Sequence, residues 1–245
     1  MLAAAERDRL RVVLVATRNP LNLGAAARAM SNFGFRRLRV VTPYEVAFRE
    51  ARSAVGAASL LARAEEYPTV AQAVADCALV IGATAGRRRE LHHPLRKLEE
   101  GARLIRKRLR SGRVALLFGS EKRGLSNQDF SHCHWLLQVP TRAEHPSMNL
   151  AQAVAVCLYE LAREAKSPRG SEKMKRATAG ELERLTGLLL QALAASGYLK
   201  PRSGAATEEK VRRLVRRMQL PASDAEVFLG MLRKIAWKLG TEEGH

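Results

Sequence analysis

The strongest constraint on the fold is a series of short segments in which nearly every residue is apolar. They occupy residues 11–16, 38–42, 78–83, 113–119 and 135–139. Strands that are covered on both faces have this uninterrupted pattern, whereas strands with one solvated face alternate apolar and polar residues. Segments with a helical period lie between and after them, at residues 24–32, 46–66, 70–76, 95–109 and 150–165. This order predicts an α/β domain with a mostly parallel sheet and helices on both of its faces.

The composition changes near residue 165. Residues 166–180 are polar and basic and contain helix breakers, which is typical of a linker. A helical period returns at residues 181–195, 208–219 and 225–239. We therefore expect an α/β domain over residues 1–165, a linker over 166–180 and a small all-α extension over 181–245. Apolar stripes should hold this extension together. The opposite face should bind phosphates through Arg212, Arg213, Arg216 and Arg217.

The charge of the chain favours a polyanionic partner. The 245 residues include 42 Lys and Arg against 24 Asp and Glu, a formal charge of +18. A field of this sign attracts nucleic acids. No apolar stretch approaches the roughly 18 residues that a membrane span needs. The first residues, MLAAAERDRLR, place charges where a signal peptide is apolar, so we expect a cytoplasmic protein that does not bind membranes.

The cysteines do not indicate disulfides or a metal. Cys77, Cys133 and Cys157 are isolated and odd in number, which is typical of reduced thiols packed in a core. His132 and His134 flank Cys133 and would share one face of a strand, but no second pair of ligands lies nearby. We therefore expect structural roles for these residues and no metal site.

Small and polar residues follow the apolar segments at three points where a chain would leave a strand. The three groups are Asn22, Gly24 and Arg28; Gly119, Glu121 and Gly124; and Ser147 and Asn149. Because the carboxyl ends of parallel strands share one edge of a sheet, we expect the three groups to converge there. The spacings GxxxxGK[ST] and GxGxxG are absent, which disfavours kinases, GTPases and ordinary dinucleotide enzymes.

Simpler structural roles are open for the same residues. Asn22, Ser147 and Asn149 are each suited to cap a helix. Arg28 is compatible with a solvated helix position. Glu121 is suited to accept hydrogen bonds from Arg28 or from a cofactor, and equally to cap a helix.

The three groups together resemble the motifs of the SPOUT-class RNA ribose 2′-O-methyltransferases, and in particular the TrmH/TrmJ branch of that class. The resemblance spans nearly all of residues 11–165, and the helical extension is similar to the TrmJ type. It implies S-adenosylmethionine as cofactor, a homodimer and a C-terminal trefoil knot in the catalytic domain. It also implies tRNA as substrate, with 2′-O-methylation of the cytidine or uridine at anticodon-loop position 32.

The resemblance also assigns roles to residues by position. Arg28 matches the catalytic arginine, with Asn22, Glu121 and Asn149 as neighbouring motif residues. The cofactor would contact, largely through backbone groups, Ala83, Thr84, Ala85, Gly119, Val139, Pro146, Ser147 and Met148. The chain departs from its relatives after Ala85, where Gly86 stands in the usual place of an arginine, and at Pro146, where relatives often have serine.

Two other functions are compatible with these motifs. One is 2′-O-methylation of ribosomal RNA by the same fold, and the other is a catalytically silent RNA-binding protein that retains the scaffold. For a tRNA substrate, a basic helix is expected to follow the phosphates through Arg103, Arg106, Lys107 and Arg108, together with the arginines of the extension.

Overall fold

The computed structural model describes residues 2–42, 56–86, 93–163, 175–199 and 204–242. Its centre is a seven-stranded sheet in the order β3-β2-β1-β6-β4-β7-β5, and every pairing is parallel. This confirms the predicted α/β class. The strands are β1 (Leu10–Val15), β2 (Arg37–Val41), β3 (Glu65–Tyr67), β4 (Leu79–Thr84), β5 (Leu95–Lys97), β6 (Val114–Phe118) and β7 (Trp135–Gln138).

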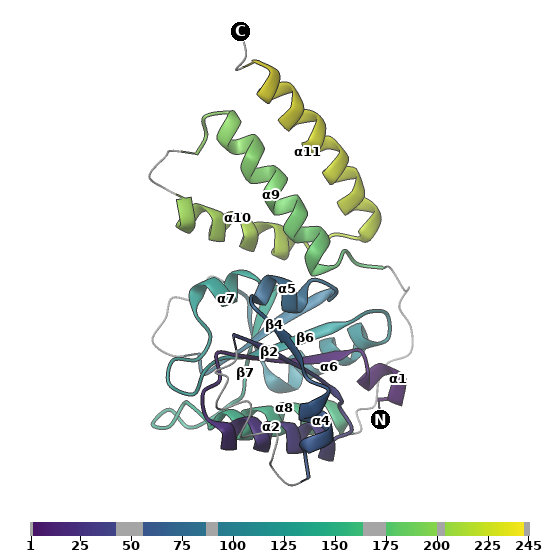
Figure 1. Ribbon diagram of the computed structural model, residues 1–245, viewed down its shortest axis with the longest axis vertical. Helices are drawn as coiled ribbons and strands as arrows, with labels where there is room; N and C mark the ends of the chain where they lie inside the picture. Colours follow the sequence, from purple (N-terminus) through teal and green to yellow (C-terminus); the bar gives the residue numbers. More distant parts are fainter. Residues whose placement is uncertain (1, 43–55, 87–92, 164–174, 200–203, 243–245) are drawn as a thin grey trace.

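Helices cover both faces of the sheet, as Figure 1 shows. One face carries α2 (Pro20–Asn32), α4 (Ala58–Ala62), α6 (Leu98–Leu109) and α8 (Leu150–Ala162). The other carries the short helices α5 (Val70–Val74) and α7 (Asn127–Ser131), and α1 (Ala4–Arg7) precedes β1 at the edge. The central strands are therefore buried on both sides, which explains why their sequences lack alternation.

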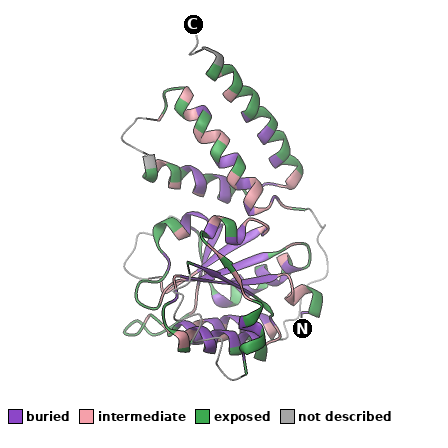
Figure 2. Cartoon of the chain, viewed as in Figure 1, coloured by how far each residue is buried: buried purple, intermediate pink, exposed green. Residues whose placement is uncertain are grey.

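Two apolar cores lie on the two faces. In β1, Val12 and Leu14 point into the larger core under α2, α6 and α8, whereas Val13 and Val15 point into the smaller one under α5 and α7. Successive strand residues face opposite sides of a sheet, so an apolar run supplies both cores at once. Figure 2 shows the burial of this central layer.

The C-terminal part forms a helical unit on the α5–α7 face (Figure 1). It consists of α9 (Ala179–Ala195), α10 (Gly204–Met218) and α11 (Ala222–Glu242) around a third apolar core that includes Leu182, Val215 and Leu229. Backbone hydrogen bonds join its start to the sheet domain. The Ala179 amide donates to the Cys77 carbonyl at 2.5 Å, and the Gly180 amide to the Ala75 carbonyl at 2.7 Å.

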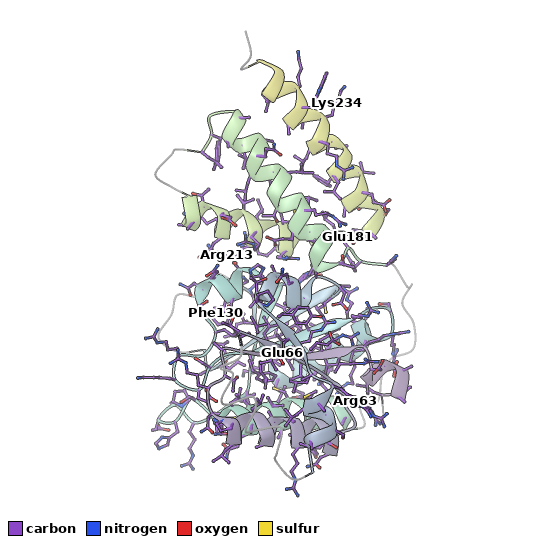
Figure 3. All side chains as sticks on the ribbon, viewed as in Figure 1. Arg63, Glu66, Phe130, Glu181, Arg213 and Lys234 are labelled. Atoms are coloured by element: carbon purple, nitrogen blue, oxygen red, sulfur yellow. The ribbon has the colours of Figure 1, made fainter. Side chains whose placement is uncertain are left out.

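The prediction that the arginines of α10 bind phosphates was wrong for two of them, Arg212 and Arg216. Arg216 is fully buried and donates to the Ala179 carbonyl at 2.8 Å and to the Glu183 carboxylate at 3.0 Å. Arg212 is 7% exposed and donates to Glu183, Glu208 and the Ser131 hydroxyl. Helix α10 forms as predicted, but the side that carries Arg212 and Arg216 packs against α7 and α9, where Glu183 accepts from both arginines. Arg213 of α10 and Phe130 of α7 mark the two sides of this junction in Figure 3.

The basic helix of the sheet domain needs a similar correction. Arg106 of α6 is 8% exposed and donates to the Glu160 carbonyl on α8 at 2.5 Å, so it joins two helices and does not face RNA. Arg103 and Lys107 are exposed, and Arg103 pairs with Glu99 one turn away. Arg106 is buried because α8 packs on the same side of α6 that its apolar residues occupy.

Several element boundaries differ from the sequence-based prediction. In the predicted helix 46–66, residues 46–55 lie outside the described ranges, Ala58–Ala62 is helical, and Glu65–Tyr67 forms β3. The start of the predicted helix 95–109 is instead the edge strand β5. Most of the predicted linker, residues 166–174, also lies outside the described ranges. Helix α9 begins at Ala179, before the residue 181 expected.

Candidate active site at the carboxyl edge of the sheet

Three segments that are far apart in sequence meet at the carboxyl edge through side-chain hydrogen bonds. The Asn149 side-chain amide donates to the Asn22 side-chain oxygen at 2.8 Å. The Asn22 amide in turn donates to the Glu121 carboxylate at 3.1 Å. Each residue comes from a different predicted motif, so the convergence expected from parallel strands is present. We call this group the Asn22–Glu121–Asn149 triplet.

Glu121 lies in the loop after β6, and its side chain contacts the chain where α2 begins. Its carboxylate accepts from the backbone amides of Asn19 at 3.4 Å and Arg18 at 3.5 Å, in addition to the Asn22 side chain. The first amides of a helix have no intrahelical acceptor and carry a partial positive charge, so a carboxylate is stabilised there. Glu121 therefore holds the β6 loop against the first turn of α2.

Asn19, and not Asn22, is the N-cap of α2. Its side-chain oxygen accepts from the Leu21 amide at 2.9 Å, and Pro20 occupies the first helical position, where its missing amide costs nothing. Because the helix begins at Pro20, before the predicted start at residue 24, Asn22 lies inside its first turn. Its side chain is then available for the contacts with Glu121 and Asn149.

Asn149 has two roles. Its side-chain oxygen caps α8 by accepting from the amides of Ala151 at 2.9 Å and Gln152 at 3.4 Å. Its side-chain nitrogen points the other way, toward Asn22. The structural and functional readings of this residue are thus both compatible with the geometry.

The loop after β6 contains a glycine that no other residue could replace without a shift of the backbone. A Cβ atom added to Gly119 would lie 2.0 Å from the Gly124 carbonyl carbon and 2.1 Å from the Leu125 nitrogen. The Gly124 amide closes this loop on the Ser120 carbonyl at 2.8 Å, and Gly124 has a φ of 67°. The tight turn brings backbone groups to the sheet edge, where a ligand can contact them directly.

The ends of β4 and β7 form the adjoining part of the edge. Ala83, Thr84 and Ala85 are half-buried, and the Gln138 side-chain amide donates to the Ala85 carbonyl at 3.2 Å. Gly86 has a φ of 73°, and a Cβ there would lie 2.5 Å from the Gln138 amide nitrogen. Gly86 is the residue at which the chain departs from the family pattern, and a glycine there lets the loop pack on Gln138. The sequence did not indicate this contact.

The third motif follows β7 as an irregular loop. Val139, Pro146 and Met148 are half-buried, and Ser147 is exposed. The Thr141 hydroxyl donates to the Pro146 carbonyl at 3.1 Å. Pro146 thus supplies a carbonyl that is already fixed in direction.

Arg28 is exposed on α2, in the second turn after Asn22. Within the described ranges it makes no hydrogen bond or ion pair with the Asn22–Glu121–Asn149 triplet. Six residues of helix advance about 9 Å and turn the side-chain direction by about 120°, so the Arg28 side chain points away from that of Asn22. Glu121 accepts from Asn22 and from backbone amides, and not from Arg28.

The chain leaves β1 through a strained residue that sequence reasoning did not identify. Ala16 has a φ of 52°, in the left-handed region that residues with a Cβ seldom adopt. Thr17, which follows it, is 2% exposed. Such outliers are retained where the surrounding structure fixes them, and they are frequent at functional sites. This one turns the chain directly toward Asn19.

The histidines near β7 have structural roles. Burial lowers the pKa of both His132 and His134 to about 3. The His134 Nδ1 atom accepts from the Val80 amide at 3.0 Å. In the parts of the chain that the structure describes, no three His, Cys, Asp or Glu side chains are arranged to hold a metal. In the same residues, no helix has both the length and the apolar character of a membrane span.

Comparison with known proteins assigns the fold to a family. Residues 9–159 match the model of the SpoU rRNA Methylase family. The chain belongs to this family. Its members use S-adenosylmethionine, as the sequence resemblance implied. The matched range includes β1 to most of α8, and with them all three motifs.

SpoU proteins named TrmJ are similar to this chain over almost its whole length. The tRNA (cytidine/uridine-2′-O-)-methyltransferase TrmJ of Cronobacter sakazakii is 32% identical over 234 residues, which cover 92% of this chain and 95% of that protein. The tRNA (cytidine/uridine/adenosine-2′-O-)-methyltransferase TrmJ of Pseudomonas aeruginosa is 35% identical over 240 residues, 92% and 93% of the two chains. The crystal structure of TrmJ from Z. mobilis ZM4 superposes with a TM-score of 0.79 at 33% identity, covering 92% and 98%.

Proposed function

We propose that this SpoU protein transfers a methyl group from S-adenosylmethionine to a ribose 2′-hydroxyl of tRNA, at the cytidine or uridine of anticodon-loop position 32. The observation that carries the proposal is the hydrogen-bonded convergence of Asn22, Glu121 and Asn149 at the edge where the candidate cofactor loops end. The similarity to TrmJ proteins extends through the helical unit, which supports tRNA over ribosomal RNA.

The loops fit a cofactor held by backbone groups. Gly119 lets the loop after β6 close against the backbone of Gly124 and Leu125, and the Pro146 carbonyl accepts from the Thr141 hydroxyl. We infer that the contacts come from the ends of β4, β6 and β7 and from the loop before α8. The residues in these segments are Ala83, Thr84, Ala85, Gly119, Val139, Pro146, Ser147 and Met148. When bound, S-adenosylmethionine supplies an electrophilic methyl group.

Arg28 is the proposed catalytic residue. A guanidinium keeps its proton in proteins, so it is unsuited to act as the general base. It can donate hydrogen bonds to the ribose hydroxyl and stabilise the negative charge that develops on this oxygen during transfer. The hydroxyl proton then passes to an RNA phosphate or to water. The exposure of the Arg28 side chain leaves it accessible to a nucleotide.

The Asn22–Glu121–Asn149 triplet has a positioning role in this scheme. It joins the start of α2, which carries Arg28, to the β6 loop and to the start of α8. Transfer requires the hydroxyl and the methyl group in line, and small displacements are costly. We infer that the triplet fixes the distance between Arg28 and the cofactor loops.

The remaining parts of the proposal concern organisation. Residues 1–165 would be the catalytic domain with its trefoil knot, 166–180 the linker, and 181–245 the tRNA-binding extension. The protein would act as a homodimer in the cytoplasm. Since Arg212 and Arg216 are buried, RNA contacts of the extension would come from exposed cations such as Arg217, Arg233 and Lys234.

Incubation with labelled S-adenosylmethionine and unmodified total tRNA tests the proposal. Ribose methylation protects the following phosphodiester from nucleases, so the labelled dinucleotide identifies the site. We expect label at one anticodon-loop dinucleotide. Label in ribosomal RNA alone would contradict the substrate, and cofactor binding without transfer to any RNA would indicate the catalytically silent alternative.

A further inference from the structure

A cavity of about 420 Å³ lies at the amino edge of the sheet, on the opposite side from the candidate active site. It is lined by Ala5, Asp8, Arg9, Arg11, Arg37, Gly112 and Arg113. These residues come from α1, from the starts of β1 and β2, and from the turn before β6. None of them belongs to the three motifs, and we call this feature the amino-edge cavity.

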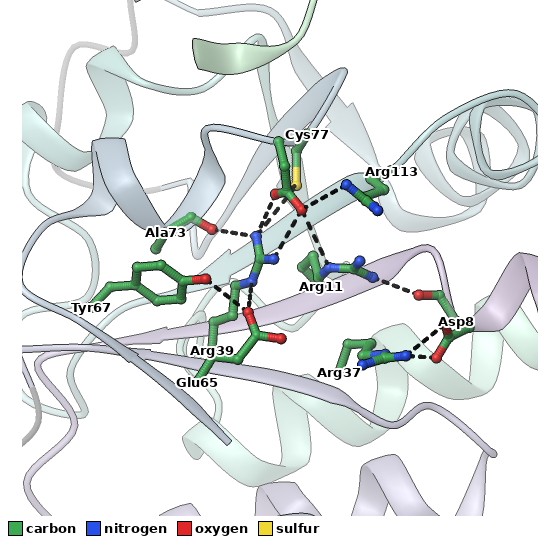
Figure 4. Close-up of polar contacts among 10 residues, drawn as sticks. Asp8, Arg11, Arg37, Arg39, Glu65, Tyr67, Ala73, Cys77 and Arg113 are labelled. Atoms are coloured by element: carbon green, nitrogen blue, oxygen red, sulfur yellow. Dashed lines mark hydrogen bonds and ion pairs between the residues drawn. The ribbon is translucent and has the colours of Figure 1, made fainter. Parts of the chain in front are cut away.

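The cavity has more positive than negative charge around it. Its lining contains four arginines and one aspartate. Arg37 forms a two-point pair with Asp8, at 2.7 and 3.0 Å. Asp76, just outside the lining, accepts from Arg39 at 2.5 and 3.0 Å and from Arg113 at 3.2 Å. Figure 4 shows these guanidinium groups gathered around few carboxylates.

Arg11 is buried and, in the described part of the chain, has no carboxylate within hydrogen-bonding distance. Its side chain is 8% exposed, and its Nε atom has no hydrogen-bond partner among the described residues; the nearest carboxylate oxygen, on Asp76, is 4.0 Å away. Its Nη1 atom donates to the Asp8 backbone carbonyl, which carries no net charge. Burial and the neighbouring Arg39 charge lower the pKa of Arg11, as expected for a cation that lacks a full counter-ion.

The charges can be summed over the whole network. The guanidinium groups of Arg11, Arg37, Arg39 and Arg113 lie around the carboxylates of Asp8, Glu65 and Asp76. Arg9 adds a fifth guanidinium, which donates to the backbone carbonyls of Leu109 and Arg110. Five positive and three negative groups leave a net charge of +2. A phosphate carries about one to two negative charges, and its oxygens match the planar fork of a guanidinium. The volume is within the range of small-ligand sites, roughly 300–1,000 Å³, which leaves room for an attached sugar.

We propose that the amino-edge cavity binds a phosphate group, carried either by a free nucleotide or phosphate ion or by the backbone of an RNA strand. The RNA source rests on the proposed function, whereas the phosphate chemistry rests only on the arginines that line the cavity. In either case Arg37 and Arg113, whose side chains are 46% and 52% exposed, are positioned to reach the ligand from the rim.

The test compares variants of the full-length protein that remove two positive charges each. In the cavity variant, R37Q/R113Q, both changes lie in the lining. The control variant, R36Q/R110Q, removes two exposed arginines outside it. A third variant, Ala5→Glu, adds a negative charge to the lining and keeps every arginine contact. Thermal unfolding of each variant establishes that it is folded.

Three ligands distinguish the two sources. Titration with adenosine monophosphate and with inorganic phosphate, followed by calorimetry, measures the free ligand. Titration with tRNA at several salt concentrations measures the RNA arm. We expect wild type and control to bind at least one ligand with affinities within about threefold of each other. We expect the cavity variant and Ala5→Glu to bind that ligand at least tenfold more weakly, a change of about 1.4 kcal/mol.

Each outcome has a defined meaning. Loss of mononucleotide or phosphate binding alone supports a free-phosphate site, and loss of tRNA affinity with a smaller salt slope supports an RNA-backbone site. Equal affinities in the cavity and control variants for all three ligands would overturn the proposal. Methyl transfer by the wild-type protein is measured separately. Its absence would contradict the proposed function without affecting the phosphate result.

Discussion

The side-chain amide of Asn22 donates to the carboxylate of Glu121 across 3.1 Å, although 99 residues separate them in the chain. One residue lies in the first turn of α2 and the other in the loop after β6. The same carboxylate accepts from the Asn19 backbone amide. Glu121 therefore both stabilises the start of α2 and aligns two of the motifs.

Glu121→Ala should therefore affect both stability and activity. We expect a loss of about 1 kcal/mol of folding free energy, which is typical of a lost interaction at a helix N-terminus. Methyl transfer should fall about tenfold to hundredfold, because Arg28 and the cofactor loops lose their alignment. Urea unfolding and a tRNA methylation assay measure the two effects. Glu144→Ala, in an exposed loop, is the control, and equal behaviour of both variants would contradict the positioning role.

Arg28→Ala should abolish methyl transfer and leave cofactor affinity unchanged, because Arg28 is exposed and outside the candidate cofactor loops. Arg28→Lys should restore little activity, since an ammonium cannot reproduce the planar fork of a guanidinium. Calorimetric titration with S-adenosylmethionine and single-turnover assays separate binding from transfer. Loss of cofactor binding in Arg28→Ala would show that this assignment is wrong. Arg36→Ala, also exposed, controls for the loss of one charge.

Gly119→Ala tests whether the loop after β6 needs a residue without a side chain. The added Cβ would lie 2.0 Å from the Gly124 carbonyl carbon, so the backbone must shift. We expect cofactor affinity to fall at least tenfold, with a loss of about 1–3 kcal/mol of stability, the usual cost of overpacking. Gly187→Ala is the matched control. It adds the same methyl group to α9 in open space and should raise stability by about 0.5–1 kcal/mol. Unchanged cofactor affinity in Gly119→Ala would exclude a close approach at this loop.

Arg216 and Arg217 are neighbours on α10 with opposite expected effects. Arg216→Met should lower the free energy of unfolding by about 3 kcal/mol, because it removes one partner of a buried pair with Glu183. Arg217→Met removes an exposed charge and should change stability by less than about 0.5 kcal/mol while weakening tRNA binding. Thermal unfolding and a filter-binding assay at fixed salt measure both. A loss of stability in Arg217→Met but not in Arg216→Met would contradict the assignment of Arg216 to the buried face of α10 and of Arg217 to the exposed face.

The buried histidines make stability depend on pH below neutrality. Burial lowers the pKa of His132 and His134 to about 3, from an ordinary value of 6.5, so the folded state holds both rings neutral. Their contribution to stability is complete above about pH 6.5 and is lost as the pH falls from there toward 3. The slope should be at most about 1.4 kcal/mol per pH unit for each ring.

Urea unfolding at pH 7.5, 6 and 5 measures this slope. His132→Gln should flatten it, whereas His145→Gln, in an exposed loop, is the control. Equal stability of the wild-type protein at pH 7.5 and 5 would contradict the prediction.

The sequence was sufficient to predict the strands of the central layer and the edge at which the motifs meet. Strands β1, β4 and β6 are buried on both faces, so their composition directly reflects their position. The edge strands β3 and β5 were missed. Each has three residues, and their sequences, EEY and LRK, carry charges that resemble exposed helix or loop. Neither periodicity nor apolarity marks a strand of that length.

The errors at the polar residues have a different cause. The prediction placed all four arginines of α10 on one exposed face, whereas the structure buries Arg212 and Arg216 against Glu183 of another helix. The sequence suggested Asn22 as the helix cap, whereas the structure shows that Asn19 and Pro20 begin α2. The contacts of Gln138 with Ala85 and of Asn149 with Asn22 also join distant segments. Local patterns identify such residues as candidates, and the tertiary structure decides their partners.

The docking of the helical unit also sets the distance between Arg28 and the exposed cations of α11. Hydrogen bonds from Ala179 and Gly180 to the loop before β4, together with the hydrogen bond from Arg212 to Ser131 on α7, hold α9 and α10 against the sheet domain. An RNA that reaches Arg28 and an exposed cation of α11 at the same time must bridge a separation that the protein has fixed in advance. If the proposed function is right, we expect the enzyme to select its target by how far the reactive ribose lies from a second anchored stretch of the same molecule.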